Sequence, residues 1–220
     1  MADTTPEGMI HAVELAIPRL LADAGRAEKD IMGIGVSIPG EVDPQKGICL
    51  QSPRFGWRDL HFAEMLAERV HAPVWIDDDV NAFAIAQKLF GAGRNHRNFA
   101  ALAIGTGIGC SLVLNGDIYH GSNSSAGKLG HITSTTGGAL CECGRRGCLM
   151  VHAAEPAMLD EYQRRRGTPI SRATFVDAVE AGDETALAIV GGEAVSSAMR
   201  CSRRCGRRWK GLSPSPSLSC

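Results

Sequence analysis

The sequence lacks several features that would place it in whole classes of protein. No apolar run in its 220 residues approaches the roughly 20 residues needed to span a bilayer, so a membrane protein is not expected. The opening residues, MADTTPEG, include acids where a secretory leader carries a basic segment, which favours a cytoplasmic location. Aromatic residues make up only 5% of the chain, and this argues against an aromatic stacking surface.

Basic residues are unevenly distributed. The formal net charge is −1, yet six of the 23 basic residues lie between Arg200 and Cys220, where no acid occurs. The preceding part has 17 basic against 24 acidic residues, a net charge of −7. We therefore expect no direct DNA binding by the main body. The tail, residues 199–220, is either aberrant or disordered, or it is a functional basic arm.

Short apolar runs alternate with amphipathic patterns in the first part of the chain. The expected elements are, in order, a helix at 6–24, a strand at 31–40, a helix at 60–70, a strand at 72–79 and a helix from Asn81 to Gly91. Pro18 is expected to kink or split the first helix. The alternation predicts a parallel α/β architecture.

The pattern changes near residues 94–98. Strands are expected next in residues 99–107 and 110–121, and the second segment contains the hairpin-turn signal Asn115-Gly116. Helices are expected to follow at 148–167, 171–182 and 183–199. We therefore expect a partial first α/β lobe in residues 1–97 and a second lobe in residues 98–198.

Possible metal ligands are concentrated in GKLGHITSTTGGALCECGRRGCLM, residues 127–150. Cys141, Cys143 and Cys148 lie within eight residues, and His131 could complete the four nitrogen and sulfur ligands that zinc prefers. Three chance loop cysteines are the alternative. In a reducing compartment a structural zinc site is favoured over a disulfide framework, and four protein ligands would leave no open position for catalysis.

Three consecutive acids end the second predicted strand, in DDDVN from Asp77 to Asn81. Ligands of open α/β sheets bind beyond such strand ends. The acids could supply a general base or a metal site. Alternatively, Asp79 only caps the following helix while Asp77 and Asp78 face solvent, and the residues alone leave this open.

Two loops containing glycine are candidate ligand loops. IGTGIG, residues 104–109, could bring backbone N–H groups and a threonine hydroxyl to an anion, or be a tight turn. IPGEVDPQKG, residues 38–47, could close over a ligand or be an ordinary loop.

Taken in order, GVSIPGEVDPQKG, SPRFGW, DDDVNAFA, IGTGIG, GKLGH and CECGRRGCL resemble the ROK family, named for repressors, open reading frames and kinases. The resemblance covers residues 6–198. It implies an actin-like ATPase (ribonuclease H-like) fold, with two α/β lobes and a cleft between them. Some members are sugar kinases, and others are transcriptional regulators with a winged helix-turn-helix before a sugar-sensing body.

The resemblance implies sugar-handling roles for four residues. Asp79 matches the general base that accepts a proton from the attacking sugar hydroxyl. Asp78 matches a sugar-binding asparagine, although a carboxylate accepts hydrogen bonds and cannot donate them. Gly40 and His131 also match positions at the sugar.

Phosphate and metal positions are implied in the same way. Gly105, Thr106 and Gly107 match a phosphate-binding loop, which would bind ATP with magnesium if the protein is a kinase. The matching zinc ligands are His131, Cys141, Cys143 and Cys148.

The chain also departs from the family pattern. Lys128 and Met150 stand where glutamates are usual, and Arg54 stands where asparagine is common. The Asp-x-Gly-Gly-Thr phosphate loop is absent before Ile31, so the first lobe is expected to be incomplete. The residues after Met199 do not resemble the family's last helices, which is typical of a gene fragment or a frameshift.

Three interpretations follow. The first is the sugar-binding body of a sugar-responsive regulator without its DNA-binding domain, with a hexose or amino sugar as ligand and a homodimer as a candidate assembly. The second is an ATP-dependent hexose kinase of the glucokinase type, although this chain is expected to be inactive as a kinase. The third is a nonfunctional fragment that keeps the zinc loop.

Overall fold

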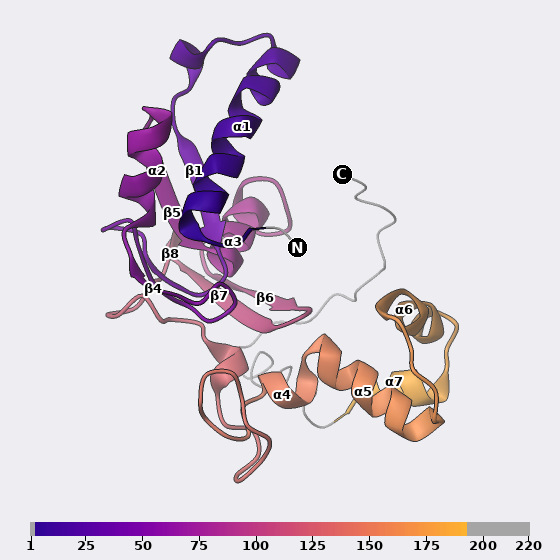
Figure 1. The fold of residues 1–220 in the computed structure, drawn as a ribbon. Coiled ribbons are helices and arrows are strands. Elements are labelled where there is room, and N and C mark those ends of the chain that lie inside the picture. Colours follow the sequence, from indigo (N-terminus) through magenta and orange to yellow (C-terminus); the bar gives the residue numbers. More distant parts are fainter. Residues whose placement is uncertain (1–2, 193–220) are drawn as a thin grey trace. The chain divides into compact units, whose positions relative to one another are not determined.

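Residues 3–192 are described by the structure, a computed structural model (Figure 1). By their contacts the residues form two units. The first runs to His131 and includes Glu142–Arg145, and the second comprises Ile132–Cys141 and the residues from Arg146 onward. The expected basic tail, 199–220, lies outside the described residues, and the expected lobe boundary near 94–98 stays a prediction.

The first unit begins with helix α1 (Pro6–Ala24). Thr5 caps it by accepting a hydrogen bond from the Gly8 N–H at 3.1 Å, and Gly25 ends it in the left-handed conformation with φ 61°. Pro18, predicted to kink or split the helix, does not split it. A proline removes a single N–H donor, and the turns on either side keep their own hydrogen bonds.

A parallel strand pair, β1 (Ile34–Ile38) and β5 (Val74–Asp78), carries the site described below. The register pairs Ile38 with Asp78, so both strands end at one edge. Helix α2 (Phe62–Val70) precedes β5 and packs against it. The core of this part consists of buried side chains from both helices and several strands: Ile10, Ile38, Val42, Cys49, Trp57, Phe62, Ala63, Leu66 and Ile76.

An antiparallel meander connects β1 to α2. Its strands are β2 (Glu41–Asp43), β3 (Ile48–Ser52) and β4 (Trp57–Leu60). The interpretation of residues 38–47 as an ordinary loop is therefore corrected, because they include β2 and the turn into β3. Strands this short give too few alternating positions for a periodic signal.

The remaining part of the first unit is an antiparallel sheet covered by helix α3 (Asp79–Leu89). The strands are β6 (Phe99–Ile104), β7 (Ile108–Leu114) and β8 (Asp117–Ile118). The predicted hairpin turn is confirmed: Asn115 and Gly116 both have positive φ, 56° and 98°, between β7 and β8.

Residues 132–149 are irregular and contain Cys141, Cys143 and Cys148; we call them the cysteine segment. Four helices follow: α4 (Met150–Ala153), α5 (Glu155–Arg166), α6 (Arg172–Glu180) and α7 (Glu184–Val190). The single helix predicted for 148–167 is broken at Ala154, which is extended. Pro156 explains the break, because its ring and missing N–H fit the first turn of α5 but not a helix interior.

Among residues 3–192, no helix has both the length and the apolar character that crossing a membrane requires. The predicted mixture of parallel strands and helices is confirmed.

Candidate functional site

The acidic triplet lies where β5 passes into α3. Asp78 is the last residue of β5 and the N-cap of α3, and its Oδ1 accepts a hydrogen bond from the Val80 N–H at 2.8 Å. Capping by Asp79 was the alternative from sequence, and the cap is instead one residue earlier. Asp78 has extended backbone angles (φ −62°, ψ 143°), whereas Asp79 is already helical.

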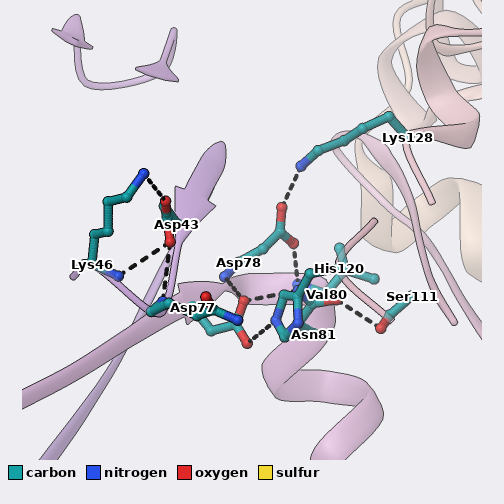
Figure 2. A network of polar contacts seen from close by, with 10 residues as sticks. Asp43, Lys46, Asp77, Asp78, Val80, Asn81, Ser111, His120 and Lys128 are labelled. Atoms are coloured by element: carbon teal, nitrogen blue, oxygen red, sulfur yellow. Dashed lines mark hydrogen bonds and ion pairs between the residues drawn. The ribbon is translucent and has the colours of Figure 1, made fainter. Parts of the chain in front are cut away.

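Asp77 is the centre of a polar network below this cap (Figure 2). Its Oδ1 accepts from Asn81 Nδ2 at 2.8 Å, and its Oδ2 lies 3.0 Å from His120 Nε2. Asn81 Oδ1 in turn accepts from the buried Ser111 hydroxyl at 2.7 Å. The network joins the end of β5, the first turn of α3, strand β7 and the segment after β8. Asp77 therefore does not simply face solvent.

Lys128 brings its ammonium group to the same strand end. Lys128 Nζ lies 2.5 Å from Asp78 Oδ2 (Figure 2). The same ammonium group donates to the Gly40 carbonyl at 2.7 Å. Gly40 follows β1, and one ammonium group therefore contacts both the Gly40 carbonyl and the Asp78 carboxylate. Two expected sugar-binding residues, Gly40 and Asp78, are in this way gathered at a single point.

Asp79 is exposed as a residue, but protein surrounds enough of its carboxyl group to change its acidity. Partial burial, followed by the charge and hydrogen bond of Asp78, raises the pKa of Asp79 above its ordinary 3.8. The Val80 N–H and the Lys128 charge act in the opposite direction. A carboxyl group with a raised pKa is a stronger base once ionised, which suits the expected role.

The expected phosphate loop forms the tight turn between β6 and β7. Gly105, Thr106 and Gly107 occupy it, and the Gly105 N–H donates to the Gly107 carbonyl at 2.9 Å. That donor is used within the turn in this conformation, so it is not directed at an anion.

The cysteine segment brings together all four predicted metal ligands. One ligand atom each from His131, Cys141, Cys143 and Cys148 lies within 4.8 Å of the others. Three sulfurs and an imidazole nitrogen are a donor set that suits a tetrahedral zinc ion. This cluster can therefore hold a metal.

Backbone contacts fix the chain on both sides of Cys148. The Gly147 carbonyl accepts from the N–H groups of Ser134 and Thr135 at 2.8 and 3.1 Å, and the Leu149 N–H donates to the Ile132 carbonyl at 2.9 Å. Gly147 has φ 73°, and a Cβ there would overlap the Thr135 carbonyl, so only glycine fits.

His131 ends the short 3-10 turn η2 (Leu129–His131) and is half-buried. Partial burial lowers the pKa of His131 below its ordinary 6.5, and the charges of Arg145 and Lys128 contribute in the same direction. The neutral imidazole, which is the form that binds metals, is thereby favoured.

The other two departures from the family pattern, Arg54 and Met150, lie outside the contacts described above. Arg54 is exposed in the turn between β3 and β4, and Met150 begins α4.

The ion pair between Lys128 and Asp78 and the role of Asp77 were not predicted from sequence. The signal for the ion pair was present: Asp78 adds a negative charge where asparagine is the family residue, and Lys128 adds a positive charge where glutamate is. Two opposite departures 50 residues apart would have suggested the pair.

The described residues define an α/β protein with a polar edge on a parallel strand pair and a His-Cys cluster. The ROK family model matches residues 1–198, and the chain belongs to the ROK family.

Relatives of two kinds are similar in sequence. The xylose repressor of Bacillus spizizenii is 36% identical over 135 residues, covering 61% of this chain and 35% of the repressor. A glucokinase of Halalkalibacterium halodurans is 38% identical over 135 residues, covering 61% of this chain and 41% of the glucokinase. The chain thus spans well under half the length of these two relatives.

Solved structures also divide between the two kinds. A ROK family transcriptional regulator, a homologue of the E. coli MLC protein, superposes with a TM-score of 0.77 at 27% identity, covering 89% of this chain and 52% of the regulator. A ROK glucokinase of Streptomyces griseus, in complex with glucose and AMPPNP, has a TM-score of 0.73 at 26% identity, covering 86% of this chain and 64% of the kinase. The predicted fold class is confirmed.

Proposed function

We propose that the chain is the sugar-binding body of a sugar-responsive ROK regulator, that it works in the cytoplasm, and that it depends on a structural zinc ion. The ligand is a hexose or an amino sugar. DNA binding would belong to a separate domain of a longer protein.

The observation that carries this proposal is the gathering of Gly40, Asp78 and Lys128 at the carboxyl edge of the β1–β5 pair. Ligands of α/β sheets bind beyond such edges. The Gly40 carbonyl and the Asp78 carboxylate offer acceptors that sugar hydroxyls require. His131, at the end of η2, would also contact the sugar.

Zinc would act on the fold rather than on the ligand's chemistry. His131, Cys141, Cys143 and Cys148 would fill its four positions and tie η2 to the cysteine segment. When bound, the ion supplies charge and geometry to the loop, and the imidazole orientation follows from it.

Isothermal titration calorimetry of the zinc-loaded chain with D-glucose, D-xylose and N-acetylglucosamine tests the sugar-binding proposal. We expect saturable one-to-one binding of at least one sugar, lost in Asp78→Ala. A folded, zinc-loaded chain that binds none of the three would overturn the proposal and favour the nonfunctional fragment.

A hexose kinase is the second candidate, supported by the raised pKa of Asp79 at the strand end. Asp79 would accept the proton of the attacking sugar hydroxyl, and Gly105, Thr106 and Gly107 would meet ATP phosphates with magnesium. The engaged Gly105 N–H argues against it. A coupled assay with ATP, magnesium and the same sugars decides: turnover abolished by Asp79→Asn would establish the kinase, and no turnover would exclude it for this chain.

A further inference from the structure

Lys128 lies at the carboxyl edge of the β1–β5 pair, the kind of edge at which ligands of open α/β sheets bind. Gly40 is two residues beyond the end of β1, and Asp78 is the last residue of its parallel partner β5. Lys128 Nζ contacts both, so an ammonium group of the protein bridges the carboxyl ends of two neighbouring strands.

Both oxygens of Asp78 are engaged by the protein itself. Oδ1 accepts from the Val80 N–H, and Oδ2 pairs with Lys128. The two side chains are largely enclosed, with 13% of Asp78 and 27% of Lys128 exposed. Each oxygen keeps a further acceptor site, but because so little of the Asp78 side chain is exposed, we expect a sugar hydroxyl to compete with the ammonium group for Oδ2.

The backbone before Lys128 is held in a conformation that only glycine adopts readily. Gly127 has φ 77°, and a Cβ on it would overlap the Cys110 carbonyl of β7. Its carbonyl accepts from the Leu129 N–H at 2.6 Å. The backbone conformation at Gly127 therefore fixes where the Lys128 side chain begins, close to the strand edge.

We propose that the Lys128–Asp78 ion pair is a clasp that a sugar must open, and that Lys128 sets the affinity and specificity of this site. This inference rests on the proposed sugar-binding function. The clasp weakens the binding of neutral sugars, because Asp78 must exchange its charge-assisted contact with Lys128 for a neutral hydrogen bond to the sugar. It also makes sugar affinity rise with ionic strength, since salt screens a pair that is still partly accessible to solvent.

Calorimetry of Lys128→Gln tests the clasp directly, because glutamine keeps polar contacts without the charge. We expect affinity for at least one of D-glucose, D-xylose and N-acetylglucosamine to increase by about threefold to fivefold, the effect of losing one ion pair that solvent partly reaches. Arg69→Gln is the control. It breaks the exposed Arg69–Glu14 pair between α1 and α2 and should leave sugar affinity unchanged. Equal or weaker sugar binding by Lys128→Gln than by wild type would overturn the clasp.

A double-mutant cycle separates failure of the clasp from failure of sugar binding. Thermal unfolding of Lys128→Gln, Asp78→Asn and the double variant should reveal a favourable coupling between the two side chains. No coupling overturns the clasp whatever the sugars do. If coupling is clear but no variant binds a sugar, the sugar-binding function is overturned. The effect of the clasp on sugar affinity is then overturned as well.

Discussion

The cysteine segment and the acidic end of β5 both concentrate polar side chains where the chain leaves regular structure, yet they satisfy them by different chemistry. At the strand end, Asp77 and Asp78 are paired with Asn81, His120, the Val80 N–H and Lys128. In the cysteine segment, three sulfurs and an imidazole converge within 4.8 Å. Thiols are weak hydrogen-bonding groups but strong zinc ligands as thiolates.

This difference indicates what each region requires. The strand end is held together by the chain's own charges and hydrogen bonds, so it should keep its structure without a ligand. The cysteine segment has backbone contacts on both sides of Cys148, and a zinc ion would add bonds that join His131 to the three cysteines. Removing one side chain should therefore affect the two regions to different extents.

The largest effect is expected from Cys143→Ser. Zinc content should decrease from about one equivalent to almost none, and the melting temperature should decrease by on the order of 10 °C, because a metal site contributes its binding free energy to folding. Cys110→Ser is the matched control, since Cys110 is also half-buried and lies outside the cluster. Metal analysis and calorimetric melting provide the measurements. Equal zinc content in the two variants would contradict the metal assignment.

A smaller effect is expected from Gly127→Ala, which disturbs the segment that presents Lys128. Positive φ and overlap with the Cys110 carbonyl should together cost about 2–5 kcal/mol of unfolding free energy. Gly137→Ala in the cysteine segment has a similar φ, 71°, but open space around it, and should cost only about 1–2 kcal/mol. Urea unfolding measures both. A Gly137→Ala cost equal to that of Gly127→Ala would show that the close approach is unimportant.

Asn81→Ala should cost about 1–3 kcal/mol, because the buried Ser111 hydroxyl and Asp77 both lose a partner. The exposed Asn95→Ala is the comparison and should change stability little. Urea unfolding checks the pair. A neutral Asn81→Ala would mean that the strand-end network does not stabilise the fold.

The smallest effect concerns Asp79. Because folding raises its pKa, the native state binds the proton more tightly, and stability falls as pH rises from the ordinary 3.8 through the folded value. Asp79→Asn should therefore raise the melting temperature by about 1–3 °C at pH 7, with the gain shrinking toward pH 4. Melting curves of both proteins across this range measure it, and a gain that grows on acidification would reverse the assigned sign.

Local signals predicted much of the fold. Thr5 and Gly25 at the ends of α1, the Asn115-Gly116 turn and the positions of strands β1 and β5 were readable from residue type and spacing. The two strands were expected to be buried, yet each has only one buried residue. The meander between β1 and α2 was missed because its strands are too short for a periodic pattern. The break at Ala154 could have been read from Pro156.

The candidate site was predictable in its residues but not in its contacts. The four candidate metal ligands, which the structure brings together, were predicted from residue types and spacing within a short segment. The pairing of Lys128 with Asp78 joins positions 50 apart, and its signal was the pair of opposite charge changes at these positions rather than a local pattern. The cap at Asp78 rather than Asp79 depends on where β5 ends, which is a boundary of one residue.

Zinc K-edge X-ray absorption of the purified chain tests most directly the claim that His131 and the three cysteines form one structural metal centre. The expected first shell has three sulfurs at about 2.3 Å and one nitrogen at about 2.0 Å. A shell of oxygen ligands, or one with fewer than three sulfurs, would contradict it.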